Sequence, residues 1–108
     1  MEKSTNNKPK DSLHTEWYDS GQKKEEGTYK NGEKDGLWIY NNKSGDKSYE
    51  RIYKNGLKNG EYTVWFENGL IGEKGNYKDD KKDGLWRWWD ENGQLRSDGD
   101  NKDGNENG

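Results

Sequence analysis

The sequence predicts an all-β fold: a repeat array of consecutive antiparallel β-hairpins that form an elongated single-layer meander sheet. The first observation is a 24-residue period in the glycines. One column contains Gly21, Gly45, Gly69 and Gly93, and a second contains Gly36, Gly60, Gly84 and Gly108. Second, the chain has no alanine, 1 proline and 15 glycines, which disfavours helices and favours tight turns. Third, 6 Trp and 7 Tyr supply the apolar area that the few aliphatic side chains do not.

The order of elements begins with a polar leader at residues 1–11, which lacks the repeat and is predicted to be disordered. A repeat domain follows over residues 12–108. Its units lie at about 12–35, 36–59, 60–83 and 84–108. Each unit contains two turn signals, such as Asn31-Gly32 and Ser44-Gly45, which tolerate positive φ and close hairpins. A unit therefore consists of two antiparallel strands and two turns, and it advances the sheet by roughly 10 Å.

The final segment, residues 98–108, keeps the glycine phase, but Asn101 replaces the tyrosine of the earlier units. The run from Asp98 to Gly104 is rich in oxygen ligands, as a calcium loop is. An EF-hand loop needs an oxygen ligand at its fifth position and glycine at its sixth, where this chain has Lys102 and Asp103. We therefore expect no metal site there, but a frayed polar tail that covers the last strand with charge.

Because the period is even and strand side chains alternate, equivalent residues of successive units share one face. If the strands contain no bulges, one face is expected to carry Tyr29, Tyr53 and Tyr77, Trp38, Tyr62 and Trp86, and Tyr40, Val64 and Trp88. The other is expected to carry Leu37, Leu85, Trp65, Trp89 and Trp17. Gly27, Gly75 and Gly99 form a column in which the missing side chain leaves room for a neighbouring ring. Arg51 stands in this column and Asp80 replaces a turn glycine, which indicates either a specific function or tolerated drift.

Composition excludes several function classes. The net charge of −3 and the isoelectric point of about 5.3 provide no global basic field for nucleic acid or anionic lipid. Aromatic rings among lysines could stack on single-stranded nucleic acid, but acidic neighbours cancel most of the local field, so no direct nucleic-acid binding is expected. The chain has no cysteine and no long apolar run, which excludes thiolate chemistry and a membrane span. A cytoplasmic location is expected.

Catalytic chemistry has few candidates. His14 is the one histidine, and the sequence places no partner beside it. Carboxylate pairs such as Asp79 and Asp80 are frequent, but a single-layer sheet offers no deep pocket to hold them around a substrate. We therefore expect no enzyme activity, no catalytic residue, no metal and no cofactor.

A partner-binding surface is the strongest functional signal. Consecutive large rings in the run Trp86–Trp89 must project to both faces of one strand, so some of this aromatic area stays exposed. Tryptophan, tyrosine and arginine dominate binding hot spots. The predicted contact residues are Trp65, Phe66, Arg87, Trp88 and Trp89. Acidic residues are predicted to supply negative potential for a basic partner surface, and these are Asp79, Asp80, Asp83, Asp90 and Glu91.

The segment from Gly27 to Trp38 resembles the bacterial variant of the MORN repeat, and so do the elements Trp17–Gly21 and Trp65–Gly69. The resemblance covers about residues 15–104. It implies a chain of β-hairpins in a single-layer sheet. Many bacterial proteins of this kind, the YwqK-type family, are described as antitoxin components that neutralise a partner toxin.

The resulting hypothesis is a non-enzymatic module that inhibits a protein effector, a toxin or another nucleic-acid-cutting enzyme. We expect a monomer or weak end-to-end self-association. The alternative is a structural scaffold at a membrane surface or in a larger assembly. Since Gly108 is in phase with the start of a unit, a fragment of a longer array is a third interpretation.

Overall fold

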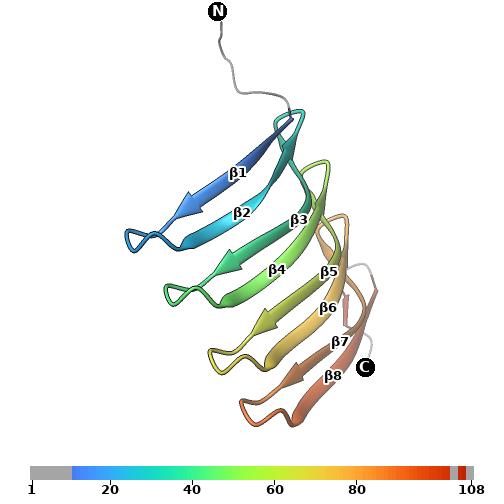
Figure 1. Ribbon diagram of the computed structural model, residues 1–108. Helices are drawn as coiled ribbons and strands as arrows, with labels where there is room; N and C mark the ends of the chain where they lie inside the picture. Colours follow the sequence, from blue (N-terminus) through green and yellow to red (C-terminus); the bar gives the residue numbers. More distant parts are fainter. Residues whose placement is uncertain (1–10, 103–104, 107–108) are drawn as a thin grey trace, which may run out of the picture.

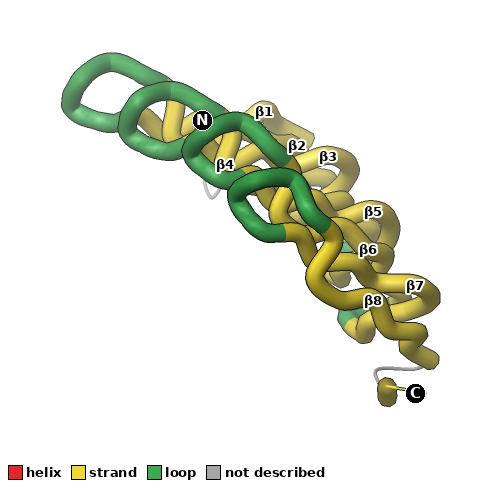
Figure 2. Tube along the Cα trace, turned by 90° about the horizontal axis from the view of Figure 1, so that it is seen from below, coloured by secondary structure: helices red, strands yellow, loops and turns green. Residues whose placement is uncertain are grey.

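The computed structural model describes residues 11–102 and 105–106, and all regular structure in them is β-sheet (Figure 1). Nine strands follow one another in sequence order and form one antiparallel sheet. They are β1 (Asp11–Trp17), β2 (Lys23–Lys30), β3 (Glu33–Asn41), β4 (Lys47–Lys54), β5 (Leu57–Trp65), β6 (Ile71–Lys78), β7 (Lys81–Trp89), β8 (Leu95–Lys102) and β9 (Asn105–Glu106). The molecule measures 56 × 35 × 13 Å, and Figure 2 shows its hairpins stacked along one direction. The predicted hairpin meander is confirmed.

Two-residue turns join the strands at one end of the sheet. Both central residues of these turns adopt positive φ, as a type I′ hairpin requires. Asn31 and Gly32 have φ values of 53° and 81° between β2 and β3. The equivalent turn between β6 and β7 uses Asp79 and Asp80, at 49° and 71°. A short polar side chain tolerates this conformation, so the glycine of the other units is replaceable here.

A bulge interrupts pairing between β2 and β3. The register changes from Glu26 opposite Ile39 to Thr28 opposite Asp35, which leaves three residues of β3 facing Gly27. The first of the three is Gly36, whose φ of 79° a larger side chain would strain. Similar register shifts occur between β4 and β5 and between β6 and β7. The column of Gly36, Gly60 and Gly84 therefore marks a bulge that is repeated in each unit.

The core lies on one face of the sheet, which we call the aromatic face. Trp38 lies over Gly27 and Trp86 lies over Gly75, and a Cβ atom at either glycine would overlap the indole ring. The two tryptophans are 4% and 0% exposed. Their Nε1 atoms donate to backbone carbonyls, 3.1 Å from Thr28 and 3.0 Å from Asn76. The ring buries its apolar area and its polar atom is satisfied at the same time.

The unit between these two replaces the glycine by Arg51 and the tryptophan by Tyr62, its cross-strand neighbour. The guanidinium carbon of Arg51 lies 4.5 Å from the centre of the Tyr62 ring, within cation–π range. A smaller ring thus leaves space for the larger residue opposite it. The Nε atom of Arg51 is buried without a hydrogen-bond partner among the described residues.

The ends of the repeat domain differ from the sequence prediction. Residues 1–10 lie outside the described residues, and β1 begins at Asp11, one residue before the predicted domain start. The expected frayed tail is wrong for residues 98–102, which belong to β8. These residues pair with β7, and Gly99 stands opposite Trp86. Backbone pairing and the place of Gly99 in the glycine column therefore hold the segment in the sheet. Residues 103–104 and 107–108 lie outside the described part of the chain.

Candidate functional site

The aromatic run at the end of β7 projects to both faces. The rings of Trp88 and Trp86 are 6.3 Å apart on the aromatic face, and the Lys82 ammonium lies 5.4 Å from the Trp88 ring. Trp89 lies on the other face, where it lines an open depression of about 240 Å³ with Arg87 and other residues. Trp88 and Trp89 are both half-buried. The structure therefore separates Trp88 from the two neighbours with which it was predicted to bind a partner.

Trp65 and Phe66 lie at the hairpin turn between β5 and β6. The Lys47 ammonium is 5.3 Å from the Trp65 ring. Phe66 packs against the backbone of Gly72, where an added Cβ would lie 3.0 Å from its ring. The Phe66 amide also donates to the Leu70 carbonyl at 2.8 Å. Phe66 thus has a structural role in its own turn.

Three of the five predicted acidic residues lie at turns and accept hydrogen bonds, either from the neighbouring strand β5 or from their own turn. Asp80 accepts a 2.7 Å bond from the Lys58 amide, and Asp79 accepts a 3.0 Å bond from the side chain of Asn59. Asp90 accepts bonds from two backbone amides of its own turn, at 2.9 and 3.0 Å. Because these turns lie at opposite ends of β7, the predicted acidic residues do not form one cluster.

The face opposite the aromatic face carries exposed aliphatic side chains, and we call it the leucine face. Leu13, Leu37 and Leu85 occupy equivalent positions on β1, β3 and β7 and are 69%, 49% and 47% exposed. Glu61 holds the fourth position of the column. The sequence placed Leu37 and Leu85 on this face, and the burial pattern agrees with that expectation.

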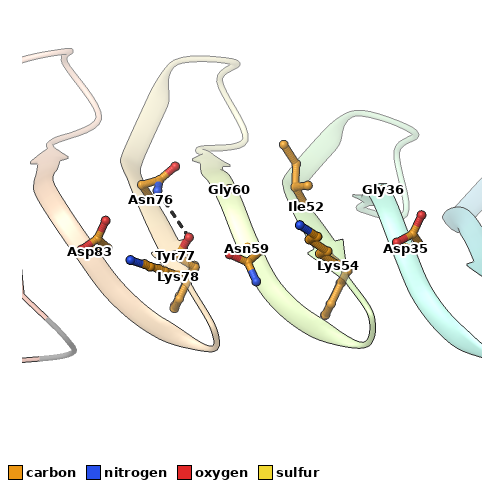
Figure 3. A pocket seen from close by; sticks show the side chains of 11 residues that line it. Asp35, Gly36, Ile52, Lys54, Asn59, Gly60, Asn76, Tyr77, Lys78 and Asp83 are labelled. Carbon is orange, nitrogen blue, oxygen red and sulfur yellow. Dashed lines mark hydrogen bonds between the residues drawn. The ribbon is translucent and has the colours of Figure 1, made fainter.

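The leucine face also contains an open depression of about 560 Å³ (Figure 3). Asp35, Asn59 and Asp83, which are 24 residues apart, line it from three successive units. Ile52 and Asn76 lie between them on the intervening strands. Of this group, only Asp83 was predicted from the sequence to contact a partner. The 24-residue spacing of the three polar residues could have indicated that they line one surface.

The polar groups of the aromatic face are largely occupied by one another. The ammonium groups of Lys34, Lys58 and Lys82 lie 4.5, 4.6 and 4.7 Å from the rings of Trp38, Tyr77 and Trp86. Burial raises the pKa of Tyr49, Tyr62 and Tyr77, although the positive charge of Arg51 lowers it in part. This face is an internally paired core.

His14 has partners that the sequence did not place beside it. Its Nε2 atom is 3.3 Å from Glu16 and 3.7 Å from Glu25, which belongs to the neighbouring strand. The imidazole stacks on Trp38 and meets Tyr29 edge-on, with ring centres 5.5 Å apart in both pairs. Within the described residues, His14, Glu16 and Glu25 form a group whose ligand atoms could hold a metal ion.

The comparisons with known proteins find one family. Residues 10–31 and 82–100 match the family described as the MORN repeat variant. The matched segments come from the first and the last units, and the glycine and aromatic columns continue through the units between them. No curated protein and no solved structure matches the chain. No helix in the part of the chain that the structure describes is long and apolar enough to cross a membrane.

Proposed function

We propose that this array of MORN-variant repeats is a non-enzymatic, cytoplasmic protein-binding module that inhibits its partner by covering the partner's active surface. The exposed leucine side chains of the leucine face are the observation that supports a binding role. Leu13, Leu37 and Leu85 stay exposed there, whereas the aromatic face buries Trp38 and Trp86. Large apolar side chains left in water on one face of an open sheet are typical of a surface that associates with another molecule.

A protein is the partner that this surface fits best. Arg87 and Trp89, of the residue types that dominate binding hot spots, border Leu85 around one depression. Lys74 and Glu61 flank the same depression and provide a polar rim. The sheet measures 56 × 35 Å along its two long directions, which exceeds the roughly 800 Å² that each partner of a standard interface contributes.

The inhibitory role extends this binding role. The net charge of −3 and the acidic residues of the short turns favour a basic partner surface, such as the substrate channel of a nucleic-acid-cutting enzyme. The resemblance to antitoxin components supports the same class of partner. A toxin or another effector of this kind is therefore the proposed target.

The test begins with capture of partners from the native cell lysate on the tagged chain, identified by mass spectrometry. The comparison variant is Leu85→Ser/Trp89→Ala, which removes apolar area from the leucine face and leaves the buried tryptophans intact. The purified partner is then assayed for nuclease or other toxic activity with and without the chain. We expect stoichiometric inhibition by the wild-type chain and at least about tenfold weaker inhibition by the variant, the loss of one good hot spot.

The alternative role is a structural scaffold, and exposed residues of the edge strand favour it. Leu13 and Trp17 on β1 are 69% and 58% exposed, and β1 pairs on one side only. Liposome co-sedimentation and light scattering distinguish the two roles. Binding to vesicles, or concentration-dependent growth into larger species without capture of an effector, would replace inhibition by the scaffold function.

A further inference from the structure

Three potential metal ligands converge where β1 pairs with β2. His14 and Glu16 are on β1, and Glu16 stands directly opposite Glu25 of β2. The Nε2 atom of His14 lies 3.3 Å from Glu16 Oε2 and 3.7 Å from Glu25 Oε1. All three ligand atoms lie within 4.8 Å of one another. The three side chains thus point at a common position on the aromatic face.

The spacing of these atoms suits a tetrahedral cation. Bonds of about 2.0–2.1 Å at tetrahedral angles place neighbouring ligand atoms about 3.3 Å apart. The His14–Glu16 distance of 3.3 Å already has this value, and Glu25 at 3.7 Å from His14 needs a shift of a few tenths of an ångström. The two carboxylate oxygens lie within 4.8 Å of each other, so they approach by up to about 1.5 Å when the ion binds. The cluster is open to water, since half of the Glu16 side chain is exposed, so water has access as a fourth ligand.

A comparison with the other units shows that these ligands are departures from the repeat. The positions equivalent to His14 hold Trp38, Tyr62 and Trp86, and those equivalent to Glu16 hold Tyr40, Val64 and Trp88. In the third unit Glu73 is equivalent to Glu25, but it faces Val64 and Trp88 instead of a second carboxylate. Two positions that hold apolar or aromatic side chains in the other units have therefore become ligands in one hairpin only.

The ligands are also arranged at an energetic cost that a cation removes. Two carboxylates directly opposite each other on neighbouring strands repel, as at Glu16 and Glu25. The stacking of His14 on Trp38 and its edge contact with Tyr29 orient the imidazole toward the two carboxylates. Lys34 approaches the other oxygen of Glu25, Oε2, at 3.8 Å and leaves Oε1 directed at His14.

We propose that His14, Glu16 and Glu25 bind a divalent transition-metal ion of the zinc class. Zinc accepts one imidazole nitrogen and two carboxylate oxygens, with water or a partner's side chain as the fourth ligand. The ion ties the edge strand β1 to β2 by bridging residues of both. This site is independent of the inhibitory function, because it lies on the aromatic face and not on the leucine face.

The test is calorimetric titration of the tag-free chain with zinc chloride at pH 7.5, with nitrogen NMR of the imidazole as a second readout. Because the chain has 1 histidine, its imidazole signals identify His14 directly. The ligand variants are His14→Phe, which keeps a ring on Trp38, and the isosteric changes Glu16→Gln and Glu25→Gln. Glu73→Gln is the matched control, since it removes the equivalent carboxylate of the third unit.

We expect one zinc ion per chain and a shift of the His14 Nε2 resonance on binding. Each ligand variant should weaken zinc binding at least about tenfold, whereas Glu73→Gln should leave it unchanged. Glu16→Gln should raise the thermal stability of the metal-free chain while it weakens zinc binding, a combination that a purely structural role for Glu16 would not produce. The site is disproved if the His14 signals do not move at saturating zinc, or if His14→Phe binds zinc as tightly as the wild type.

Discussion

The indole of Trp86 occupies the space above Gly75 that a side chain at residue 75 would need. The tryptophan is 0% exposed, and its Nε1 atom donates to the carbonyl of Asn76, the residue after that glycine. The same relationship joins Trp38 to Gly27 two units earlier. Because no second layer packs on this sheet, each tryptophan ring buries its apolar area against the glycine backbone of a neighbouring strand.

Gly75→Ala is therefore expected to destabilise the fold, because the new Cβ overlaps the Trp86 ring and forces it off the strand. Overpacking of this kind costs about 1–3 kcal/mol. Denaturant unfolding monitored by tryptophan fluorescence measures the change. Asn76→Ala, at the exposed neighbouring position, is the control and should cost about 0.5 kcal/mol or less. Equal losses in the two variants would show that the ring has room to move.

A second prediction concerns the coupled pair Arg51 and Tyr62. Arg51→Gly alone should open a gap beside Tyr62, and Tyr62→Trp alone should crowd the guanidinium 4.5 Å away. The double variant restores the glycine–tryptophan pair of the adjacent units and also removes the buried, unpaired Nε atom. We expect it to be more stable than either single variant, with a coupling of about 0.5–3 kcal/mol in a double-mutant cycle. Additive changes would mean that the two residues do not share one space.

A third prediction follows from the raised pKa values of Tyr49, Tyr62 and Tyr77, for which burial is the main cause. The folded chain holds these phenolic protons more tightly than the unfolded chain. Their contribution to stability is therefore complete below the unfolded pKa of about 10 and is lost as pH rises through the folded values. Thermal melts between pH 8 and pH 11.5 should show a falling midpoint. Tyr62→Phe should reduce this slope, and an unchanged slope would remove Tyr62 from the effect.

The turn between β6 and β7 provides a fourth prediction. Asp80 has a φ of 71° and accepts the Lys58 amide at 2.7 Å, so it combines the backbone role of a glycine with a side-chain bond. Asp80→Ala loses the bond and keeps the strained backbone, and we expect a loss of about 1–3 kcal/mol. Asp80→Gly relieves the strain and should cost less. Chemical denaturation of both variants gives the order, and a more stable alanine variant would contradict it.

The repeat allowed much of the fold to be predicted. The glycine and tyrosine columns specify the number of strands per unit and the turn positions, and they predict that Trp38 and Trp86 share one face, as they do in the structure. The bulge opposite Gly27 was not predictable from an even period, because register shifts preserve the spacing between units. The prediction of a frayed tail at residues 98–102 was wrong because it rested on the acidic composition of this segment. The position of Gly99 in the glycine column was the better indicator, since this residue pairs with Trp86 in the sheet.

The candidate sites were harder to predict than the fold. The residues chosen near Trp88 and Trp89 were adjacent in sequence, but alternation along β7 sends those two rings to opposite faces. The His14 cluster was missed because Glu25 reaches it through pairing across a hairpin turn, and sequence proximity gives no signal of that contact. Aligning all units by column, and searching for polar residues at ring positions, would have found it.

The ring contacts also bear on how such a protein can change its length. Trp38 contacts His14 and Tyr53, and Tyr62 contacts Trp86, so no aromatic contact among the described residues extends beyond the next hairpin. Duplication or loss of a 24-residue stretch that keeps Arg51 together with Tyr62 would leave Trp38 over Gly27 and Trp86 over Gly75. Gene-level gain and loss of such units can therefore lengthen or shorten the sheet in steps of about 10 Å without redesign of the interior.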